Sequence, residues 1–221
     1  MKLSEASKRL NEISEIPFSK LFSKAELANI KRNKGKAGQL LELALGMELS
    51  NGNLDFEDGE LKSNKCDASG NPLETVFVTQ ISSMFDELVS GVPFESTRLY
   101  RKIDNILYVP VCKFPENSPE LWMFLPSIHI DLTNPRFSFL REIWKNDYIS
   151  ICQQFRQQLD ASPTATLHTA NGVHLQVRTK DSAPYHPIFS SVYGRQVSNK
   201  NRAFYFQKQF VYDIRRIAAD K

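Results

Sequence analysis

The sequence predicts an α/β fold, because segments with a helical spacing of apolar residues alternate along its 221 residues with segments of strand character. The clearest helical pattern is the amphipathic stretch at 135–159, and the clearest strand is the largely apolar run at 105–113. Hydrophobic residues make up 41% of the chain and charged residues 24%, so a full core can form. At this length we expect one domain.

The first third of the chain is expected to form helices and then strands. Apolar residues recur at helical spacing over 3–13, and a second helix is predicted over 33–45, with an asparagine N-cap and a glycine after its last turn. The acidic segment 55–62 follows and has the pattern of a β-hairpin. A dense turn signal at 67–72 then leads into an alternating strand at 74–81.

Downstream, the pattern predicts in order a loop running into a short helix (93–102), the buried strand, the long helix, a strand (172–180), a loop to residue 201, a short strand (203–206) and a closing helix. The proline-rich region 114–135 gives no clear assignment. Alternation over 172–180 places His174, Gln176, Arg178 and Lys180 on one face, which therefore carries the donors that a DNA base edge accepts.

Bulk charge and the cysteines limit the class of protein. The net charge is +3, and basic residues cluster at 31–36 and 195–216, which suits a polyanionic partner. The three cysteines lack a C-x-x-C spacing, so the sequence predicts neither a disulfide framework nor a zinc site. Without an apolar run of membrane-spanning length or a signal peptide, a cytoplasmic protein is expected.

The acidic segment carries the strongest chemical signal. Asp55 is followed by Glu60-Leu61-Lys62, and residues two apart in a strand share a face, so Glu60 and Lys62 would project together. Asp55 would come from the neighbouring strand of the hairpin. Two carboxylates can hold Mg²⁺ beside a phosphodiester, and a lysine can stabilise the charged transition state. An ordinary solvated strand has the same pattern, so the triplet alone does not decide between the two interpretations.

Other enzyme classes have no support in the sequence. It contains no nucleotide-binding glycine loop, no H-E-x-x-H motif and no serine-nucleophile motif. The four histidines show no metal-ligand spacing.

Three separated motifs, in order, resemble the MutH family of DNA endonucleases. They are Lys31 to Gly46 with Asp55, Glu60-Leu61-Lys62 and Gly70 to Val78; Phe94 to Val111; and Gln176 to Lys180 with Phe204 to Lys208. The resemblance implies a restriction-endonuclease-like α/β core of the PD-(D/E)xK type, with a mixed central sheet flanked by helices. It also implies two lobes around a DNA cleft, a catalytic lobe at roughly 1–113 and a helical, DNA-reading lobe at roughly 114–221.

The resemblance assigns catalytic roles to five residues. Asp55 and Glu60 would be ligands of Mg²⁺, and Lys62 the active-site lysine. Glu42 would be an additional acid that reaches the site from its helix, and Lys102 a second lysine near the scissile phosphate. For Glu42 and Lys102 an ordinary solvated position is the alternative.

The resemblance also assigns DNA contacts. Arg178 and Lys180 would read base edges, although an exposed polar strand face is the alternative, and Tyr205 would sit where the family senses adenine methylation. Glu74 would help to organise these contacts, and Lys34 in the first basic cluster is expected to bind DNA. The chain departs from the family's usual pattern at one place, because Asp55 and Glu60 are closer in sequence, so Asp58 or Glu57 are alternatives for the first metal ligand.

The function expected from these motifs is a Mg²⁺-dependent, sequence-specific DNA endonuclease of the type II restriction class that cuts a short site such as GATC. Its partners would be double-stranded DNA and a cognate DNA methyltransferase. The first alternative is a nicking endonuclease of methyl-directed mismatch repair, with MutL as its partner. The second is a non-catalytic DNA-binding domain of the same fold. The sequence leaves open the recognition sequence, the methylation dependence and the oligomeric state.

Overall fold

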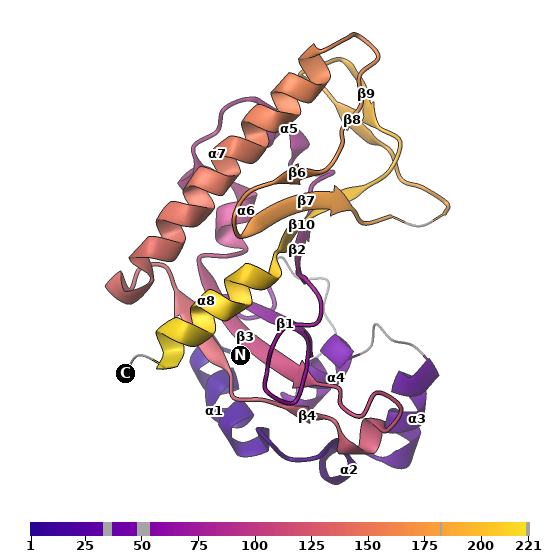
Figure 1. Cartoon of the computed structure of the whole chain (residues 1–221), viewed down its shortest axis with the longest axis vertical. Helices are drawn as coiled ribbons and strands as arrows, with labels where there is room; N and C mark the ends of the chain where they lie inside the picture. The colour runs from indigo at the N-terminus through magenta and orange to yellow at the C-terminus, as the bar shows by residue number, and fades with distance from the viewer. Residues whose placement is uncertain (33–36, 48–53, 182, 220–221) are drawn as a thin grey trace. The chain divides into compact units, whose positions relative to one another are not determined.

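A computed structural model describes residues 1–32, 37–47, 54–181 and 183–219, and within it the chain forms two compact units (Figure 1). Unit 1 comprises Met1–Glu74, Asn105–Asp131 and Val211–Lys221, and unit 2 comprises Thr75–Asp104 and Leu132–Phe210. The sequence analysis placed a single boundary between lobes near residue 113. The units divide the chain differently, because each is assembled from segments that are not contiguous in sequence.

Unit 1 contains a mixed sheet, as the sequence predicts. Strand β3 (Asn105–Cys112) is buried along almost its whole length and pairs in parallel with β1 (Glu60–Cys66), from Glu60 opposite Ile106 to Cys66 opposite Cys112. The short strands β4 (Met123–Phe124) and β5 (Ile128–Asp131) pair with β3 in antiparallel orientation. Both short strands lie in the proline-rich region 114–135, for which the sequence pattern predicts no element.

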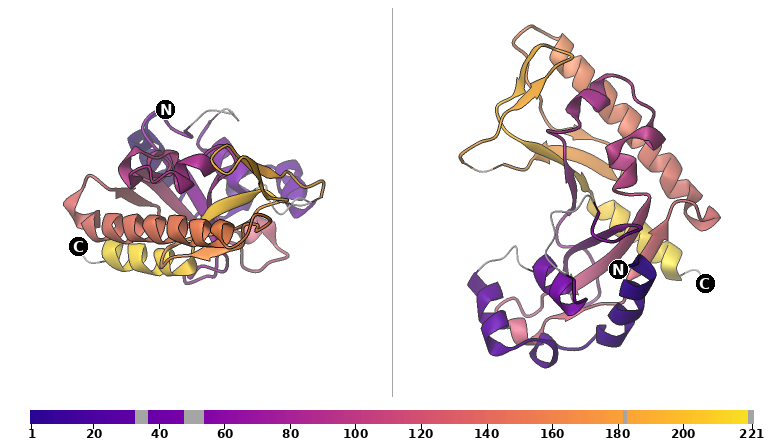
Figure 2. Two further views of the ribbon diagram at one scale, coloured as in Figure 1. Left: turned by 90° about the horizontal axis from the view of Figure 1, so that it is seen from above. Right: turned by 180° about the vertical axis from the view of Figure 1, so that it is seen from behind.

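Helices cover the sheet of unit 1 (Figure 2). They are α1 (Leu3–Ile13), α2 (Phe18–Leu21), α3 (Lys24–Arg32), α4 (Ala37–Ala44) and the 3₁₀ turn η3 (Pro119–Leu121). Their apolar side chains and those of the sheet form one core cluster, in which Leu10 of α1, Leu41 of α4 and Val109 of β3 are buried. The prediction of helix α1 is confirmed. The predicted N-cap of the second helix, Asn33, lies outside the described residues.

The prediction of a hairpin before β1 is wrong. Residues 54–58 form a bend, closed by a hydrogen bond from the Phe56 amide to the Gly59 carbonyl (2.9 Å), and β1 then pairs with a strand more than forty residues away. Gly59 approaches that strand so closely that a Cβ would lie 2.6 Å from the Asn105 carbonyl oxygen. Asp55 therefore belongs to the bend that precedes β1 and not to a neighbouring strand.

Unit 2 is built on an antiparallel sheet with the strand order β2-β10-β7-β6. The bounds are β2 (Val76–Gln80), β6 (Ala170–Asn171), β7 (Leu175–Thr179) and β10 (Arg202–Phe206). A separate hairpin of β8 (Ile188–Ser190) and β9 (Arg195–Ser198) lies within the predicted loop before residue 201. The sequence analysis missed this hairpin because its strands are short and carry few apolar residues.

The helices of unit 2 include the long amphipathic helix that the sequence predicts. It is α7 (Ser138–Asp160), which follows the 3₁₀ turn η4 (Pro135–Phe137) and packs its buried stripe of Leu140, Trp144, Ile151, Phe155 and Leu159 toward β6 and β7 (Figure 1). The shorter helices are α5 (Phe85–Val89), η2 (Phe94–Ser96) and α6 (Arg98–Arg101). Helix α8 (Lys208–Ala219) begins in unit 2 and continues in unit 1. None of the described helices is both long and apolar enough to cross a membrane.

The predicted strand at 172–180 is shorter in the structure, where it spans Leu175–Thr179, and the prediction that His174 lies on its polar face is wrong. His174 is buried, and its Nδ1 accepts a hydrogen bond from the indole N–H of Trp144 (3.1 Å). The buried carboxylate of Asp147 accepts the backbone N–H groups of Val173, His174 and Leu175 at 2.6–2.8 Å. These amides bond to a side chain and not to a neighbouring strand, so β7 begins only at Leu175.

Candidate functional site

Three of the predicted catalytic side chains meet at the start of β1 in unit 1. The ammonium of Lys62 donates a hydrogen bond to the carboxylate of Glu60 and lies 3.9 Å from Oδ2 of Asp55. The side chains of Glu60 and Lys62 are 3% and 8% exposed, whereas that of Asp55 is 38% exposed. An ion pair on an ordinary solvated strand would not be buried in this way, so the surface-charge interpretation of the motif does not fit.

The position of Asp55 is fixed by the start of the strand. Its Oδ2 accepts the backbone N–H of Leu61 at 2.9 Å, which holds the carboxylate beside Lys62. The two alternative acids are placed differently. Asp58 accepts the backbone N–H of Leu3 at 2.7 Å, at the first turn of α1, and the side chain of Glu57 is 61% exposed. Among the acids of this bend, Asp55 is therefore the one that lies beside Lys62 together with Glu60.

Glu42 of α4 is close enough to this group to interact with its charge. Partial burial, and then the negative charge of Asp55, raise the pKa of Glu42. Its neighbours Leu40, Leu41 and Leu45 are buried in the core of unit 1, whereas Glu42 is half-buried. The helix thus directs its apolar face inward and keeps one carboxyl group within electrostatic range of Asp55.

The donor set fits a hard divalent cation. No group of three His, Cys, Asp or Glu side chains with metal-binding geometry occurs among the described residues. Asp55 and Glu60, however, direct carboxylate oxygens at the same ammonium, so a cation beside Lys62 could contact both. Mg²⁺ is commonly held by one or two carboxylates together with water and substrate phosphate, so two protein ligands are sufficient.

A second group of predicted residues comes together on the sheet of unit 2. The guanidinium of Arg178 lies 4.3 Å from the ring centre of Tyr205, and the ammonium of Lys180 lies 5.1 Å from the ring centre of Phe77. The two rings meet edge to face at 5.6 Å, since Tyr205 on β10 is opposite Phe77 on β2. A guanidinium nitrogen of Arg178 also donates to the hydroxyl of Thr75 (2.9 Å). We call these five residues the reading cluster.

The reading cluster combines exposed cations with a rigid aromatic base. Arg178 and Lys180 are exposed, Phe77 is 39% exposed, and Tyr205 is 8% exposed. Burial raises the pKa of Tyr205, although the charge of Arg178 acts in the opposite direction, so its hydroxyl stays protonated at neutral pH. The sequence analysis missed Thr75 and Phe77. In the predicted strand 74–81, Val76 and Val78 form the buried face, so Thr75 and Phe77 lie on the opposite, outer face. This alternation is the signal that could have identified them.

The remaining predicted residues are Glu74, Lys102 and Lys34. Glu74 accepts the backbone N–H of Lys65 on β1 at 2.8 Å, and its carbonyl accepts the side-chain amide of Asn64. Its carboxylate thus ties the chain beside β1 within unit 1. Lys102 is half-buried at the end of α6 in unit 2, whereas Asp55, Glu60 and Lys62 belong to unit 1. Lys34 lies outside the described residues.

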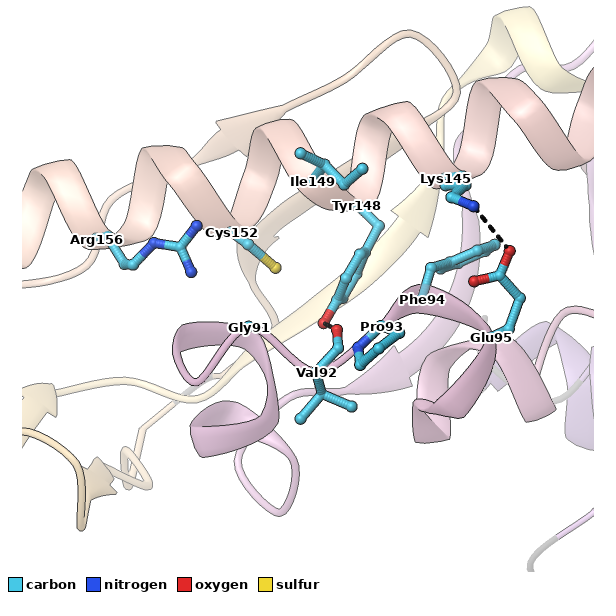
Figure 3. Close-up of a pocket in the computed structure, with 10 residues that line it drawn as sticks. All are labelled: Gly91, Val92, Pro93, Phe94, Glu95, Lys145, Tyr148, Ile149, Cys152 and Arg156. Carbon is cyan, nitrogen blue, oxygen red and sulfur yellow. Dashed lines mark hydrogen bonds and ion pairs between the residues drawn. The ribbon is translucent and has the colours of Figure 1, made fainter.

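A pocket of about 210 Å³ in unit 2 contains none of the predicted site residues (Figure 3). It lies between α7 and the loop that precedes η2. Tyr148 crosses it and donates to the Val92 carbonyl at 2.8 Å, and Lys145 closes one side through an ion pair with Glu95 at 3.2 Å. Because Tyr148, Lys145 and Glu95 already have partners within the lining, these groups give no sign of catalytic chemistry in the pocket.

Comparisons with known proteins agree with the motifs. No family model matches the chain. It is 28% identical over 217 residues to a DNA mismatch repair protein MutH of Vibrio campbellii, covering 96% of this chain and 92% of that protein. It is 29% identical over 195 residues to the MutH of an Escherichia coli strain, covering 82% and 76%. With the MutH of Buchnera aphidicola it shares 30% identity over 192 residues, which cover 84% of this chain and 82% of that protein. This identity over most of both chains shows that the chain belongs to the MutH family.

Proposed function

We propose that this protein is a Mg²⁺-dependent DNA endonuclease that nicks DNA in methyl-directed mismatch repair. The observation that carries the proposal is the convergence of Asp55 and Glu60 on the buried ammonium of Lys62. A buried carboxylate paired with a buried lysine is costly to keep in a fold, and a phosphodiester with a divalent cation would satisfy the charges of Glu60, Lys62 and the more exposed Asp55.

Each side chain has a defined role in the proposed hydrolysis. Asp55 and Glu60 would hold Mg²⁺, which when bound polarises the scissile phosphate and acidifies water. Lys62 places a positive charge where negative charge develops on the phosphate oxygens. Its hydrogen bond to Glu60 and its contact with Asp55 fix the ammonium before DNA arrives. Glu42, whose pKa is raised by burial and by Asp55, is suited to hold or accept a proton near the reacting group.

Sequence recognition is proposed for the reading cluster. Arg178 has the paired donors that match the O6 and N7 acceptors of guanine, and Lys180 can donate to a purine acceptor. Tyr205 supports Arg178 from below and would lie next to the adenine whose methylation is sensed. Glu74 and Lys34 are proposed to help organise the DNA contacts, and Lys102 to act near the scissile phosphate.

The relatives favour a repair role over the restriction role that the sequence analysis put first. Each of the three relatives compared is named a DNA mismatch repair protein. A repair enzyme of this kind would nick one strand, act on unmethylated or hemimethylated GATC and be stimulated by MutL. A type II restriction enzyme paired with a methyltransferase would cut both strands without a partner.

The catalytic assignment is tested by nicking of supercoiled plasmid with Mg²⁺. Asp55→Asn and Lys62→Ala are each expected to reduce the rate at least about a hundredfold, because each removes a charge that acts on the transition state. Lys65→Ala on the same strand is the matched lysine control, and Asp58→Asn is the matched acid control; both should cut like the parent. DNA affinity should change little in all four variants.

Two outcomes would contradict the assignment. Equal rates for Lys62→Ala and Lys65→Ala would exclude the active-site lysine, and a loss confined to Asp58→Asn would transfer the metal ligand to that residue. A parent protein that binds DNA but never cuts it would support the non-catalytic alternative.

The repair role is tested with hemimethylated, unmethylated and fully methylated GATC duplexes. We expect nicking of the first two, protection of the third and a rate increase on adding MutL with ATP. Efficient double-strand cleavage that MutL leaves unchanged would favour the restriction class instead.

A further inference from the structure

The guanidinium of Arg178 is held by side chains from two other segments of unit 2. The hydroxyl of Thr75, immediately before β2, accepts one of its N–H groups at 2.9 Å. The ring of Tyr205 on the central strand β10 lies against the guanidinium at 4.3 Å. Arg178 itself is near the end of β7, where its backbone pairs opposite Ala203. Three segments thus determine the position of one exposed charge.

These two contacts restrain different motions of the guanidinium. Contact with an aromatic face limits the tilt and height of the planar group, whereas a hydrogen bond at one edge limits its rotation within that plane. An arginine on an exposed strand face otherwise samples many rotamers, and ordering it on binding costs conformational entropy. Thr75 engages one N–H group of Arg178, and the hydroxyl of Tyr205 is a second hydrogen-bond partner. Because a guanidinium carries five N–H groups, others remain that a ligand could accept.

Phe77 packs against Tyr205 and so supports the ring on which Arg178 lies. Phe77 meets Tyr205 edge to face at 5.6 Å, and Lys180 lies over Phe77 at 5.1 Å. The rings therefore space the two cations along β7. Thr75 supplies Arg178 with a directional polar contact from a second segment, in addition to the hydroxyl of Tyr205.

We infer that Thr75 is a positioning residue for specificity, which orients Arg178 so that its free N–H groups meet a single base edge. The inference rests on the proposed DNA endonuclease function, because it assigns to Thr75 the alignment of a base-reading side chain. A bidentate pair with a base depends on the plane of the guanidinium, whereas attraction to a phosphate depends mainly on its charge. Thr75 should therefore affect discrimination between sequences and leave non-specific affinity unchanged.

The decisive variant is Thr75→Val, which keeps the shape of the side chain and removes the hydroxyl. Thr75→Ser restores the acceptor, and Thr79→Val is a matched control on β2, at a position that pairs with Phe204 of β10. The cut site is first mapped on plasmid DNA with the parent protein. Cleavage rates are then measured on duplexes with the mapped site and with each single base-pair change, and affinity is measured on a duplex without the site.

Thr75→Val is expected to lower discrimination at one base pair by about five- to tenfold, the effect of one lost hydrogen bond on a bidentate contact. Thr75→Ser should restore it, and Thr79→Val should match the parent. If Thr75→Val keeps the parent's discrimination while the parent cuts DNA, the inference is wrong and the proposed function stands. An equal loss on all duplexes, including the one without the site, would indicate a structural role and overturn it. A parent without any cleavage would refute the proposed function and this inference together.

Discussion

Replacement of Asp147 should destabilise the protein more than any exposed substitution on the same helix. Asp147 is 3% exposed on α7, and its two carboxylate oxygens accept three consecutive backbone N–H groups, from Val173 to Leu175, at 2.6–2.8 Å. The chain packs tightly around it, since a Cβ on Gly172 would lie 2.3 Å from the carboxylate. Removal of the carboxylate would leave these three amides without their protein acceptor.

The magnitude follows from the number of bonds. A hydrogen bond to a charged group contributes about 1.5–3 kcal/mol, and a buried donor left without a partner costs about 1–3 kcal/mol. The three bonds share one carboxylate, so their energies do not simply add. Asp147→Ala should therefore lower the free energy of unfolding by about 4 kcal/mol, a large part of the about 5–15 kcal/mol typical of a folded domain. Asp147→Asn keeps one acceptor oxygen and should lose less.

Urea unfolding followed by far-ultraviolet circular dichroism measures the change. Glu142→Ala, an exposed acid on the same helix, is the matched control and should fall within about 0.5 kcal/mol of the parent. If Asp147→Ala lies within about 1 kcal/mol of that control, the carboxylate does not anchor the start of β7. Because Arg178 lies on β7, the folded fraction of Asp147→Asn should also discriminate less between DNA sequences.

Three further outcomes are expected. Gly59→Ala should lower the melting temperature, because its Cβ would lie 2.6 Å from the carbonyl oxygen of Asn105. Gly38→Ala in α4 has open space for a Cβ and should stabilise the protein by about 0.5–1 kcal/mol. Equal melting temperatures for the two variants would contradict the close packing of Gly59. Hydrogen bonds from His186 lower the pKa of Asp181 to about 2. The contribution of Asp181 to the free energy of unfolding is therefore present above about pH 4 and is lost as the pH falls toward about 2. Asp181→Asn should make the free energy of unfolding less dependent on pH over that interval. Burial raises the pKa of Cys66 to about 12, so iodoacetamide at pH 8 should label this thiol only in urea, and labelling of the folded protein would refute its burial.

The spacing of apolar residues correctly predicted the helices and strands that bury an apolar surface. The spacing of Leu3 and Leu10 matches the buried face of α1, and the apolar run at 105–113 became the buried strand β3. The stripe that includes Trp144 became α7. In each case the apolar side chains lie on a surface that must be covered, so the local sequence contains the signal.

Features that depend on distant partners could not be predicted in this way. The acid-rich bend before β1 has the composition of a hairpin, but its strand pairs in parallel with residues that follow far downstream. His174 alternates with polar neighbours, yet it is buried because Asp147, on another element, binds the surrounding amides. The proposed catalytic residues Asp55, Glu60 and Lys62 could be predicted from the sequence because they are close in the chain. Thr75 and Arg178, over a hundred positions apart, meet only in the fold.

The interleaved assembly of the two units has a consequence for how sequence preference can change in this lineage. The chain passes between units at 74/75, 104/105, 131/132 and 210/211, so unit 2 consists of two separate stretches of the gene. A single crossover between residues 80 and 202 would therefore separate β2 from its partner β10, and one upstream of residue 75 would also exchange segments of unit 1. If the reading cluster sets sequence preference, as proposed, point substitutions on β2, β7 and β10 change it without disturbing unit 1, and an engineered exchange should replace 75–104 and 132–210 together.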